Sequence, residues 1–400
     1  MATTATASLP IADWYTQHKR PLPDNRSWPI VPGRAPSPSH RSRVLEIARR
    51  RATPTTPGEE HVVVALFANV GAIGFLKNLL CSLGRLHIER WMTVAFDAKV
   101  CPALASGGFD ATACAFPYDG AIGGSQAHNG VEGMTKYRTL DFNTLVFHRV
   151  AWIFFLLRKG LSVLHCDADV VWLKDPLTYL SALPEHDILV QSEQSFGNNG
   201  GFYLARASVR TCDAFRWWLE DLRNRWNVGQ KKFEEQHSLN DMLRNGRKHR
   251  RGMNISALKL PDASFPNGRI WWVGGKMSTK RVAYVVHCNW VKTTKKARLV
   301  RDNLWFLADD DASCRAGFDP LEAGCDRRCV PVSTQASARC SLGRRCAPCA
   351  GIGGCCDRLA ARIGRSKSWH PMAYRLANCS HVPLVQYEER RRPPPPPAIK

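Results

Sequence analysis

The sequence predicts an α/β fold, in which a sheet of mainly parallel strands carries helices on both faces. Two observations predict it. Uniformly apolar runs, which are typical of strands buried on both faces, alternate with longer stretches in which apolar residues recur at helical spacing. The first such unit runs from a strand at 61–70 through a helix at 71–86 to a strand at 91–98. This order is that of a βαβ unit in a parallel sheet.

The same alternation continues to about residue 290. A helix is expected over 141–160, ending at Gly160, because glycine is common just after a helix. A strand over 162–173 follows it. The remaining expected elements are strands at 186–191, 202–206, 255–261 and 281–290 and helices at 211–226 and 232–246. No internal repeat of roughly 20–50 residues is visible, which argues against a solenoid or a propeller.

Two flanking segments differ in composition from this region. Residues 1–60 are rich in proline and show no periodicity, so we expect a flexible leader. Nine of the 15 cysteines lie in residues 314–400, a basic segment that ends in polyproline. Their short spacings fit either a disulfide-stapled module or a zinc module. We therefore expect a leader over 1–60, an α/β domain over 61–313 and a small Cys-rich tail over 314–400.

The formal net charge of the chain is +22. A basic surface attracts polyanions, so nucleic acid, anionic membranes, nucleotides and acidic polysaccharides are all candidate partners. The basic residues form no recognisable nucleic-acid motif and are densest in the tail, which makes nucleic acid the weaker of these partners.

The segment SVLHCDADVVWLKDP, residues 162–176, carries the most chemical information. Its apolar run delivers Asp167 and Asp169 to the end of an expected strand, separated by one residue. Ligands of open α/β sheets bind beyond the carboxyl ends of the strands. Carboxylate oxygens suit Mg²⁺ or Mn²⁺. A cation held by only two carboxylates and its waters keeps coordination positions open for phosphate oxygens. The spacing therefore predicts a cation that bridges the protein to a diphosphate.

Two other interpretations of this segment remain open. Two aspartates after a strand often cap the next helix, which would give them a structural role. An apolar strand followed by D-x-D-x-V is also how haloacid-dehalogenase-type phosphatases present a nucleophilic Asp and an acidic Asp. The apolar residues 170–172, which extend the run past Asp167 and Asp169, favour the metal interpretation.

With its flanking blocks, L-H-C-D-A-D-V-V-W-L-K-D-P resembles the signature of the nucleotide-diphospho-sugar transferase family of retaining glycosyltransferases, which includes plant and algal xylosyl- and arabinosyltransferases. The similarity runs from about His61 to Trp305 and includes four further blocks in order: Asn-Gly-Gly-Phe, Glu-Gln-x-x-Leu-Asn, Phe-Pro-Asn-Gly and His-x-Asn-Trp. The resemblance implies a GT-A-like, Rossmann-type domain. It also implies a metal-dependent transfer of sugar from a nucleotide sugar, a UDP-sugar, to a glycan or glycoprotein acceptor with retention.

The resemblance assigns the metal ligands. Asp167 and Asp169 would hold Mn²⁺ or Mg²⁺, and His287 matches the third ligand of the family. Neutral imidazole is an acceptable ligand for Mn²⁺ and a poor one for Mg²⁺. The alternative for His287 is a half-buried structural histidine.

The resemblance also places residues around the sugar. Asn199 and Gly200 match the loop that contacts the donor sugar, and Gln236 matches a residue near the anomeric carbon on the acceptor side. Glu235 stands where the family usually has Asp, so a carboxylate is kept but its reach differs. The alternatives are an ordinary glycine-rich turn and the polar face of a helix.

Four basic residues are candidates for the leaving diphosphate. Lys292, Lys295 and Lys296 follow the His-x-Asn-Trp block and would neutralise its charge. Arg149 stands where the family commonly has Lys and would contact a phosphate. A solvated lysine face is the alternative for the three lysines.

A secretory location, in the Golgi lumen, follows from the resemblance, and it favours disulfides in the tail because the lumen is oxidising. Members of such families carry an N-terminal membrane anchor. The longest apolar stretch here, His61 to Phe75, falls short of the roughly 18–20 residues that span a bilayer, and no signal peptide is visible, so membrane association would need an anchor missing from this sequence. A non-enzymatic alternative is a basic lectin-like or nucleic-acid-binding protein.

Overall fold

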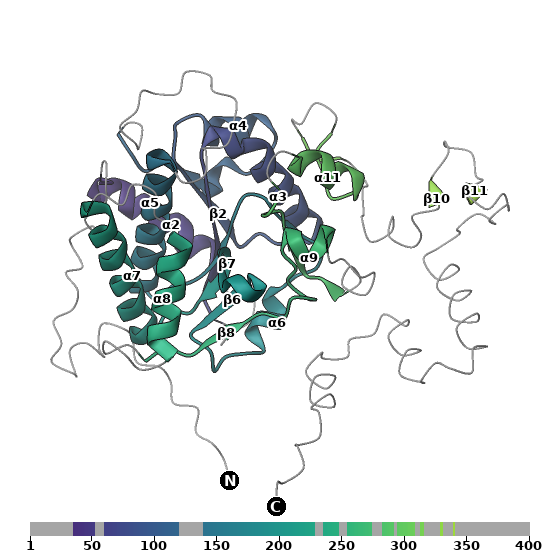
Figure 1. The fold of residues 1–400 in the computed structure, drawn as a ribbon. Coiled ribbons are helices and arrows are strands. Elements are labelled where there is room, and N and C mark those ends of the chain that lie inside the picture. Colours follow the sequence, from purple (N-terminus) through teal and green to yellow (C-terminus); the bar gives the residue numbers. More distant parts are fainter. Residues whose placement is uncertain are drawn as a thin grey trace, which may run out of the picture. The chain divides into compact units, whose positions relative to one another are not determined.

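The computed structural model divides the chain into two compact units, Met1–Phe318 and Asp319–Lys400. The first unit contains the α/β fold (Figure 1). The second contains, among its described residues, a short antiparallel pair of strands, β10 (Cys329–Val330) and β11 (Arg339–Cys340). The structure describes residues 35–52, 60–119, 139–228, 235–247, 254–273, 282–291, 294–308, 313–315, 329–330 and 339–340.

A seven-stranded sheet with the order β3-β2-β1-β4-β7-β6-β8 forms the centre of the first unit. All neighbouring strands are parallel except β7, which runs antiparallel to both β4 and β6. The strands are β1 (Val62–Ala68), β2 (Trp91–Ala95), β3 (Cys114–Ala115), β4 (Ser162–Cys166), β6 (Ile188–Ser192), β7 (Asn198–Ala205) and β8 (Ala257–Lys259). The predicted α/β class is confirmed, and the sheet is mixed because of β7.

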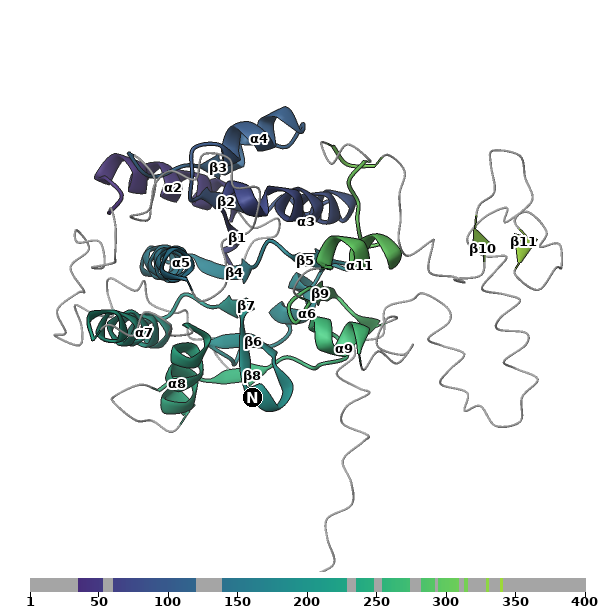
Figure 2. The ribbon, with the colours of Figure 1, turned by 45° about the horizontal axis from the view of Figure 1, so that its top comes forward.

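Helices cover both faces of this sheet (Figure 2). The side chains of β1 alternate between the faces, as a period of two requires. Val63 and Ala65 pack in the core with one group of helices, and Val64 and Leu66 pack in the core with the other. The first group is α2 (Pro38–Arg51), α5 (Leu140–Arg158), α7 (Val209–Asn227) and α8 (Glu235–Arg247), and the second is α3 (Ile73–Arg85), α4 (Val100–Ser106) and α6 (Leu177–Ser181). Because both faces are covered, β1 is apolar along its whole length.

Helix α2 lies in the segment for which the sequence predicts a flexible leader, and that prediction is wrong for residues 38–51. Ser37 caps the helix by accepting a hydrogen bond from the His40 N–H. Val44 and Ile47 are buried in the core on the face that α2 shares with α5. The pattern is easily missed because few apolar residues stand among many arginines and because Pro38 suggests a turn. Proline is tolerated at the first position of a helix, where its missing N–H is not needed.

A second, two-stranded sheet follows β4 along the chain. It pairs β5 (Val170–Trp172) with β9 (Val285–His287) in antiparallel register. Its core includes side chains from α9 (Gly268–Trp272) and α11 (Lys295–Arg301). Strand β5 begins directly after Asp169, and its first residue, Val170, pairs with His287. The small sheet therefore holds His287 next to the aspartate pair. No helix in the described part of the chain is both long and apolar enough to cross a membrane.

Two disulfides join described cysteines of the first unit. Cys101 bonds Cys114, and Cys81 on α3 bonds Cys314. The sequence grouped Cys314 with the tail, whereas the structure bonds it to the α/β core. Three described thiols, Cys166, Cys212 and Cys288, are free and buried. Burial raises the pKa of Cys212 to about 12.

Removing the Cys81–Cys314 bond should destabilise the protein more than removing Cys101–Cys114. The first bond closes a loop with a sequence separation of 233 residues and the second one of 13. Loop entropy in the unfolded chain gives about 5 kcal/mol for the long loop and about 3 kcal/mol for the short one. Denaturant unfolding of the Cys81→Ala/Cys314→Ala and Cys101→Ala/Cys114→Ala variants measures this order. Equal unfolding midpoints for the Cys81→Ala/Cys314→Ala variant and the wild type would show that this disulfide does not stabilise the folded protein.

Candidate active site

The carboxyl end of β4 lies where the chain changes direction in the sheet. The chain proceeds from β1 outward to β2 and β3 and then returns to the other side of β1 with β4. Ligands of open α/β sheets bind beyond the carboxyl ends of the strands at such a reversal. Asp167 follows β4 directly, and its N–H donates to the carbonyl of Gly201 at 2.7 Å. Asp169 precedes β5, and its carbonyl accepts from the Cys288 N–H at 3.0 Å. These bonds fix the backbone of both aspartates at this end of the sheet.

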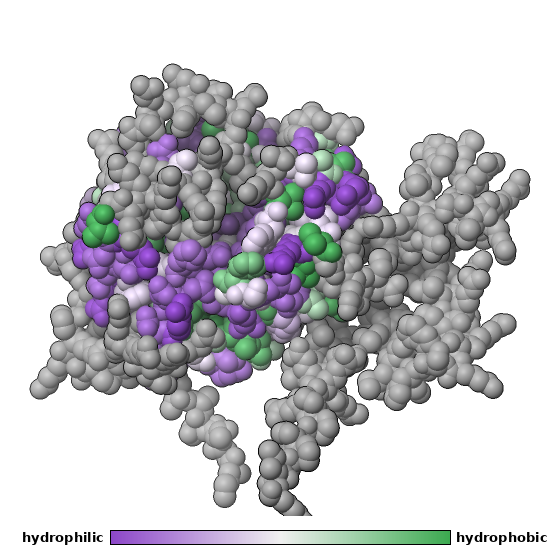
Figure 3. Space-filling model, viewed as in Figure 1, coloured by the Kyte–Doolittle hydropathy of each residue, from purple (hydrophilic) through white to green (hydrophobic). Residues whose placement is uncertain are grey.

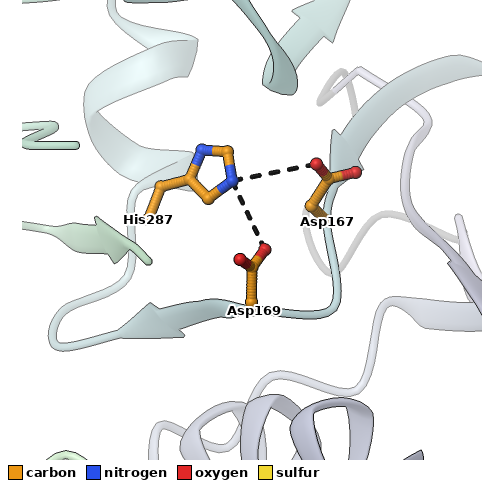
Figure 4. A group of neighbouring side chains, drawn as sticks. All are labelled: Asp167, Asp169 and His287. Carbon is orange, nitrogen blue, oxygen red and sulfur yellow. Dashed lines mark ion pairs between the residues drawn. The ribbon is translucent and has the colours of Figure 1, made fainter. Parts of the chain in front are cut away.

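The third member of the cluster, His287, comes from the last residue of β9, which pairs with Val170. Its Nε2 lies 3.3 Å from Asp169 Oδ1 and 3.7 Å from Asp167 Oδ2 (Figure 4). The ligand atoms of Asp167, Asp169 and His287 all lie within 4.8 Å of one another. The side chains of Asp169 and His287 are buried, whereas that of Asp167 is 34% exposed. The cluster is therefore open on the Asp167 side, where a substrate can reach it.

Gln191 orients the His287 ring, although the sequence did not single it out. The amide nitrogen of Gln191 lies 3.0 Å from the Phe265 carbonyl and 3.3 Å from that of Pro266, to which it donates. Its Oε1 must therefore face His287 Nδ1, 2.8 Å away. This assignment places a proton on Nδ1 and turns Nε2 toward the carboxylates. The sequence offers one signal for this role, because Gln191 is a polar residue that follows the apolar run Ile188–Val190 of an expected strand.

Gly201 makes room for the cluster. A Cβ at this position would overlap Asp167 Oδ2 and would lie 2.5 Å from His287 Cε1. Only glycine fits there without moving a side chain of the cluster. Two carboxylates and one imidazole are also a donor set that suits Mn²⁺. The residues present therefore fit a divalent cation.

The cluster is strongly polarised. Burial alone would raise the pKa of Asp167, but Arg149, His165 and His287 outweigh it and lower the pKa to about 2. Burial also opposes the ionisation of Asp169, but Lys295 and His287 outweigh it and lower its pKa. The pKa of His287 is raised because the two carboxylates outweigh burial. A cation bound at this site would replace the proton that the carboxylates stabilise on the imidazole.

Arg149 and Glu235 connect the cluster to helix α8. Arg149, on α5, donates from Nη1 to Asp167 Oδ1 at 2.7 Å and from Nη2 to Glu235 Oε1 at 2.5 Å. Burial raises the pKa of Glu235 even though Arg149 opposes it. The structure thus gives Arg149 two carboxylate partners, and its predicted phosphate contact stays a prediction.

The glycine-rich start of β7 meets the start of α8. The Gly200 N–H donates to Gln236 Oε1 at 3.3 Å, and a Cβ on Gly200 would lie 2.5 Å from Glu235 Oε1. Asn199 accepts from the Gly201 N–H at 2.7 Å and donates to the Glu193 carboxylate. The structure therefore brings Asn199, Gly200, Glu235 and Gln236, all predicted from the sequence, to one edge of the cluster.

The predicted lysines lie in different surroundings. Lys295, at the start of α11, donates from Nζ to Asp169 Oδ2 at 2.5 Å. Lys296 is exposed, and its Nζ lies 5.1 Å from the ring centroid of Trp305. Lys292 lies outside the described residues. Of the three, the structure places Lys295 at the cluster.

A sequence profile of the nucleotide-diphospho-sugar transferase family matches residues 86–300. An uncharacterized Arabidopsis thaliana protein is 30% identical over 136 residues, which cover 34% of this chain and 40% of that protein. An Arabidopsis UDP-D-xylose:L-fucose alpha-1,3-D-xylosyltransferase is 23% identical over 282 residues, 64% of this chain and 68% of the relative. A Dictyostelium discoideum UDP-galactose:fucoside alpha-3-galactosyltransferase is 23% identical over 307 residues, 65% of this chain and 45% of the relative.

Among solved structures, the glycosyltransferase GlyE of Streptococcus pneumoniae is similar with a TM-score of 0.39 and 16% identity, over 66% of this chain and 62% of that one.

The family profile spans more than half of the sequence, including the aspartate pair, the Asn-Gly-Gly-Phe loop and His287. This chain therefore belongs to the nucleotide-diphospho-sugar transferase family.

Proposed function

We propose that this protein is a divalent-metal-dependent glycosyltransferase that moves a sugar from a UDP-sugar to a glycan or glycoprotein acceptor with retention. The observation that carries the proposal is the meeting of Asp167, Asp169 and His287 beyond the carboxyl end of β4, in a chain that belongs to this family. UDP-sugars are proposed because two relatives are named for UDP-xylose and UDP-galactose donors. The family match supports this reaction over the phosphatase and the non-enzymatic alternatives.

Asp167, Asp169 and His287 would hold Mn²⁺ or Mg²⁺. When bound, the cation neutralises charge that develops on the nucleoside diphosphate as the bond to the sugar breaks. Lys295 would supply a further positive charge to the diphosphate, since its ammonium lies 2.5 Å from Asp169 Oδ2, an oxygen of a proposed metal ligand. Asn199 and Gly200 would contact the donor sugar, and Gln236 would lie next to its anomeric carbon.

Retention needs either a covalent enzyme intermediate or attack on the face that the leaving group departs from. Glu235 is the carboxylate beside the Gly200 loop, and its Oε1 accepts a charge-assisted hydrogen bond from Arg149 at 2.5 Å. That bond weakens Glu235 as a nucleophile. The arrangement favours same-face attack, in which an oxygen of the leaving diphosphate takes the proton of the acceptor hydroxyl.

We propose that the protein works in the secretory pathway, in the Golgi lumen. The two disulfides of the described core support this location, because such bonds persist in oxidising compartments.

The test is a panel of UDP-sugars incubated with the full-length protein, with and without Mn²⁺, in which release of UDP is measured. The proposal expects release that depends on Mn²⁺ and on one or a few of the sugars. A chelator should abolish it. Release of phosphate from small phosphoesters without turnover of any nucleotide sugar would instead support the phosphatase alternative.

Gln191→Leu should weaken Mn²⁺ binding by about 10–100-fold, because residues that orient a ligating histidine contribute on this scale. Leucine keeps the volume of Gln191 but removes the oxygen that holds His287 Nδ1, 2.8 Å away. Titration of the protein with Mn²⁺ measures the affinity, and thermal unfolding in a chelator measures stability separately. An unchanged affinity in a folded variant would show that Gln191 does not orient the ligand.

A further inference from the structure

Two large aromatic side chains stand exposed near the candidate active site. Phe196 is 55% exposed and Trp290 is 51% exposed. Their ring centroids lie 5.1 Å apart, and the guanidinium of Arg269 lies 5.4 Å from the Phe196 centroid and 5.8 Å from that of Trp290. The described surface in Figure 3 is largely hydrophilic, with a few separate hydrophobic patches. An exposed pair of large aromatic rings on such a surface is a candidate binding place.

The Trp290 ring is held in a fixed orientation. Its backbone has a φ of 61°, a left-handed conformation that a bulky residue rarely adopts. Its Nε1 donates to Glu193 Oε2 at 2.5 Å. The other oxygen of Glu193 accepts from Asn289 Nδ2 at 2.5 Å and from Asn199. Such local strain persists only where the surroundings enforce it, and it clusters at functional sites.

The aromatic pair is linked directly to the candidate active site. Trp290 stands three residues after His287, and three residues span at most about 11 Å. Glu193 bonds both Trp290 and Asn199, the residue proposed to contact the donor sugar. One or two sugar rings bridge a distance of this size.

The position of the pair favours the acceptor over the nucleotide. Phe196 ends a short turn, η3 (Gln194–Phe196), that follows β6, and Trp290 follows β9. In the strand order, β6 lies on the β7 side of β4, whereas the parallel β1 and β2 lie on the other side. A nucleotide bound at the reversal between β1 and β4 would lie on the other side of β4 from Phe196. The aromatic pair would then be free to bind a different ligand.

We propose that Phe196 and Trp290 form a stacking platform for a pyranose ring of the acceptor glycan. This inference rests on the proposed glycosyltransferase function. A pyranose has an apolar face of C–H groups, which packs on aromatic rings, and a rim of hydroxyls. Arg269, which is exposed, supplies N–H donors at the edge of the platform, and the partly exposed Asn289 lies next to Trp290. A polar rim around a small aromatic surface suits a sugar better than the broad apolar face of a protein partner.

The test uses three probes, methyl α-L-fucopyranoside, methyl β-D-xylopyranoside and methyl α-L-arabinopyranoside. The fucoside is included because two relatives are named for fucose or fucoside substrates. Saturation-transfer NMR with the full-length protein, in the presence of diamagnetic Mg²⁺ and UDP, should show at least one probe bound through the C–H protons of one face. Phe196→Ala should weaken that binding about fivefold or more. Trp290→Phe, which keeps a ring but loses the bond to Glu193, should have a smaller effect.

Val228→Ala is the matched control, because Val228 is 72% exposed at the end of α7, and it should leave binding unchanged. Binding of none of the probes, equal binding by Phe196→Ala, or displacement of the pyranoside by UDP would overturn the platform. Binding of UDP is measured in the same samples. If UDP binds and the pyranosides do not, the platform alone is wrong, whereas pyranoside binding without UDP binding would contradict the proposed function.

Discussion

Asp169→Asn should lower Mn²⁺-dependent release of UDP from a UDP-sugar by about 1000-fold or more, because it removes one charge from the group proposed to hold the cation. Asparagine keeps the shape of the side chain, so the backbone bond from Cys288 to the carbonyl of residue 169 should survive. The variant also leaves Lys295 without its carboxylate partner. Initial rates at several Mn²⁺ concentrations measure the effect and show whether added metal rescues it.

A control for this variant lies in the same segment. Asp175 accepts a hydrogen bond from the Leu177 N–H at 2.8 Å and stands outside the cluster. Asp175→Asn should therefore change the rate by no more than about twofold. Equal rates for the wild type and Asp169→Asn would contradict the assignment of Asp169 as a ligand, and an equal loss in both variants would indicate a general effect on folding.

Arg149→Met should destabilise the folded protein by about 3–5 kcal/mol, the usual cost of removing one partner from a buried ion pair. The change leaves the carboxylates of Asp167 and Glu235 without the guanidinium that lies 2.7 Å and 2.5 Å from them. Glu235 is buried and Asp167 is partly exposed, and without Arg149 two neighbouring carboxylates cannot both stay ionised cheaply. Denaturant unfolding in a chelator measures the loss without any contribution from metal.

Two further variants separate this explanation from a simple loss of packing. Arg149→Met/Glu235→Gln should recover part of the stability, because it removes one of the orphaned charges. Arg158→Met, at the far end of the same helix α5, should cost no more than about 1 kcal/mol, as expected for a change near the surface. A double variant no more stable than Arg149→Met alone would show that the charge on Glu235 is not the cause.

The sequence predicted the α/β fold because its signals are local. Buried strands such as Val62–Ala68 are apolar throughout, and Gly160, at a φ of 80°, follows the helix that was expected to end there. The direction of β7 was not predicted, because an apolar run does not record which neighbour it pairs with. Helix α2 was missed because three buried residues among arginines give a weak periodicity.

The candidate site was partly predictable for a related reason. Asp167 and Asp169 stand out because they interrupt an apolar run at the end of a strand. His287 could be placed with them only through the family resemblance, since the pairing of β5 with β9 joins residues more than 100 positions apart. Gln191 and Glu193 were not predicted, because their importance comes from hydrogen bonds to residues distant in sequence.

The most direct test of the central claim is electron-nuclear double resonance of Mn²⁺ bound to the full-length protein together with UDP. The claim is that Asp167, Asp169 and His287 hold one cation that also binds the diphosphate. A single Mn²⁺ should couple both to ³¹P of UDP and to the imidazole nitrogen of His287, and His287→Ala should remove the nitrogen coupling. A Mn²⁺–UDP complex whose coupling to nitrogen is absent, or is unchanged in His287→Ala, would contradict it.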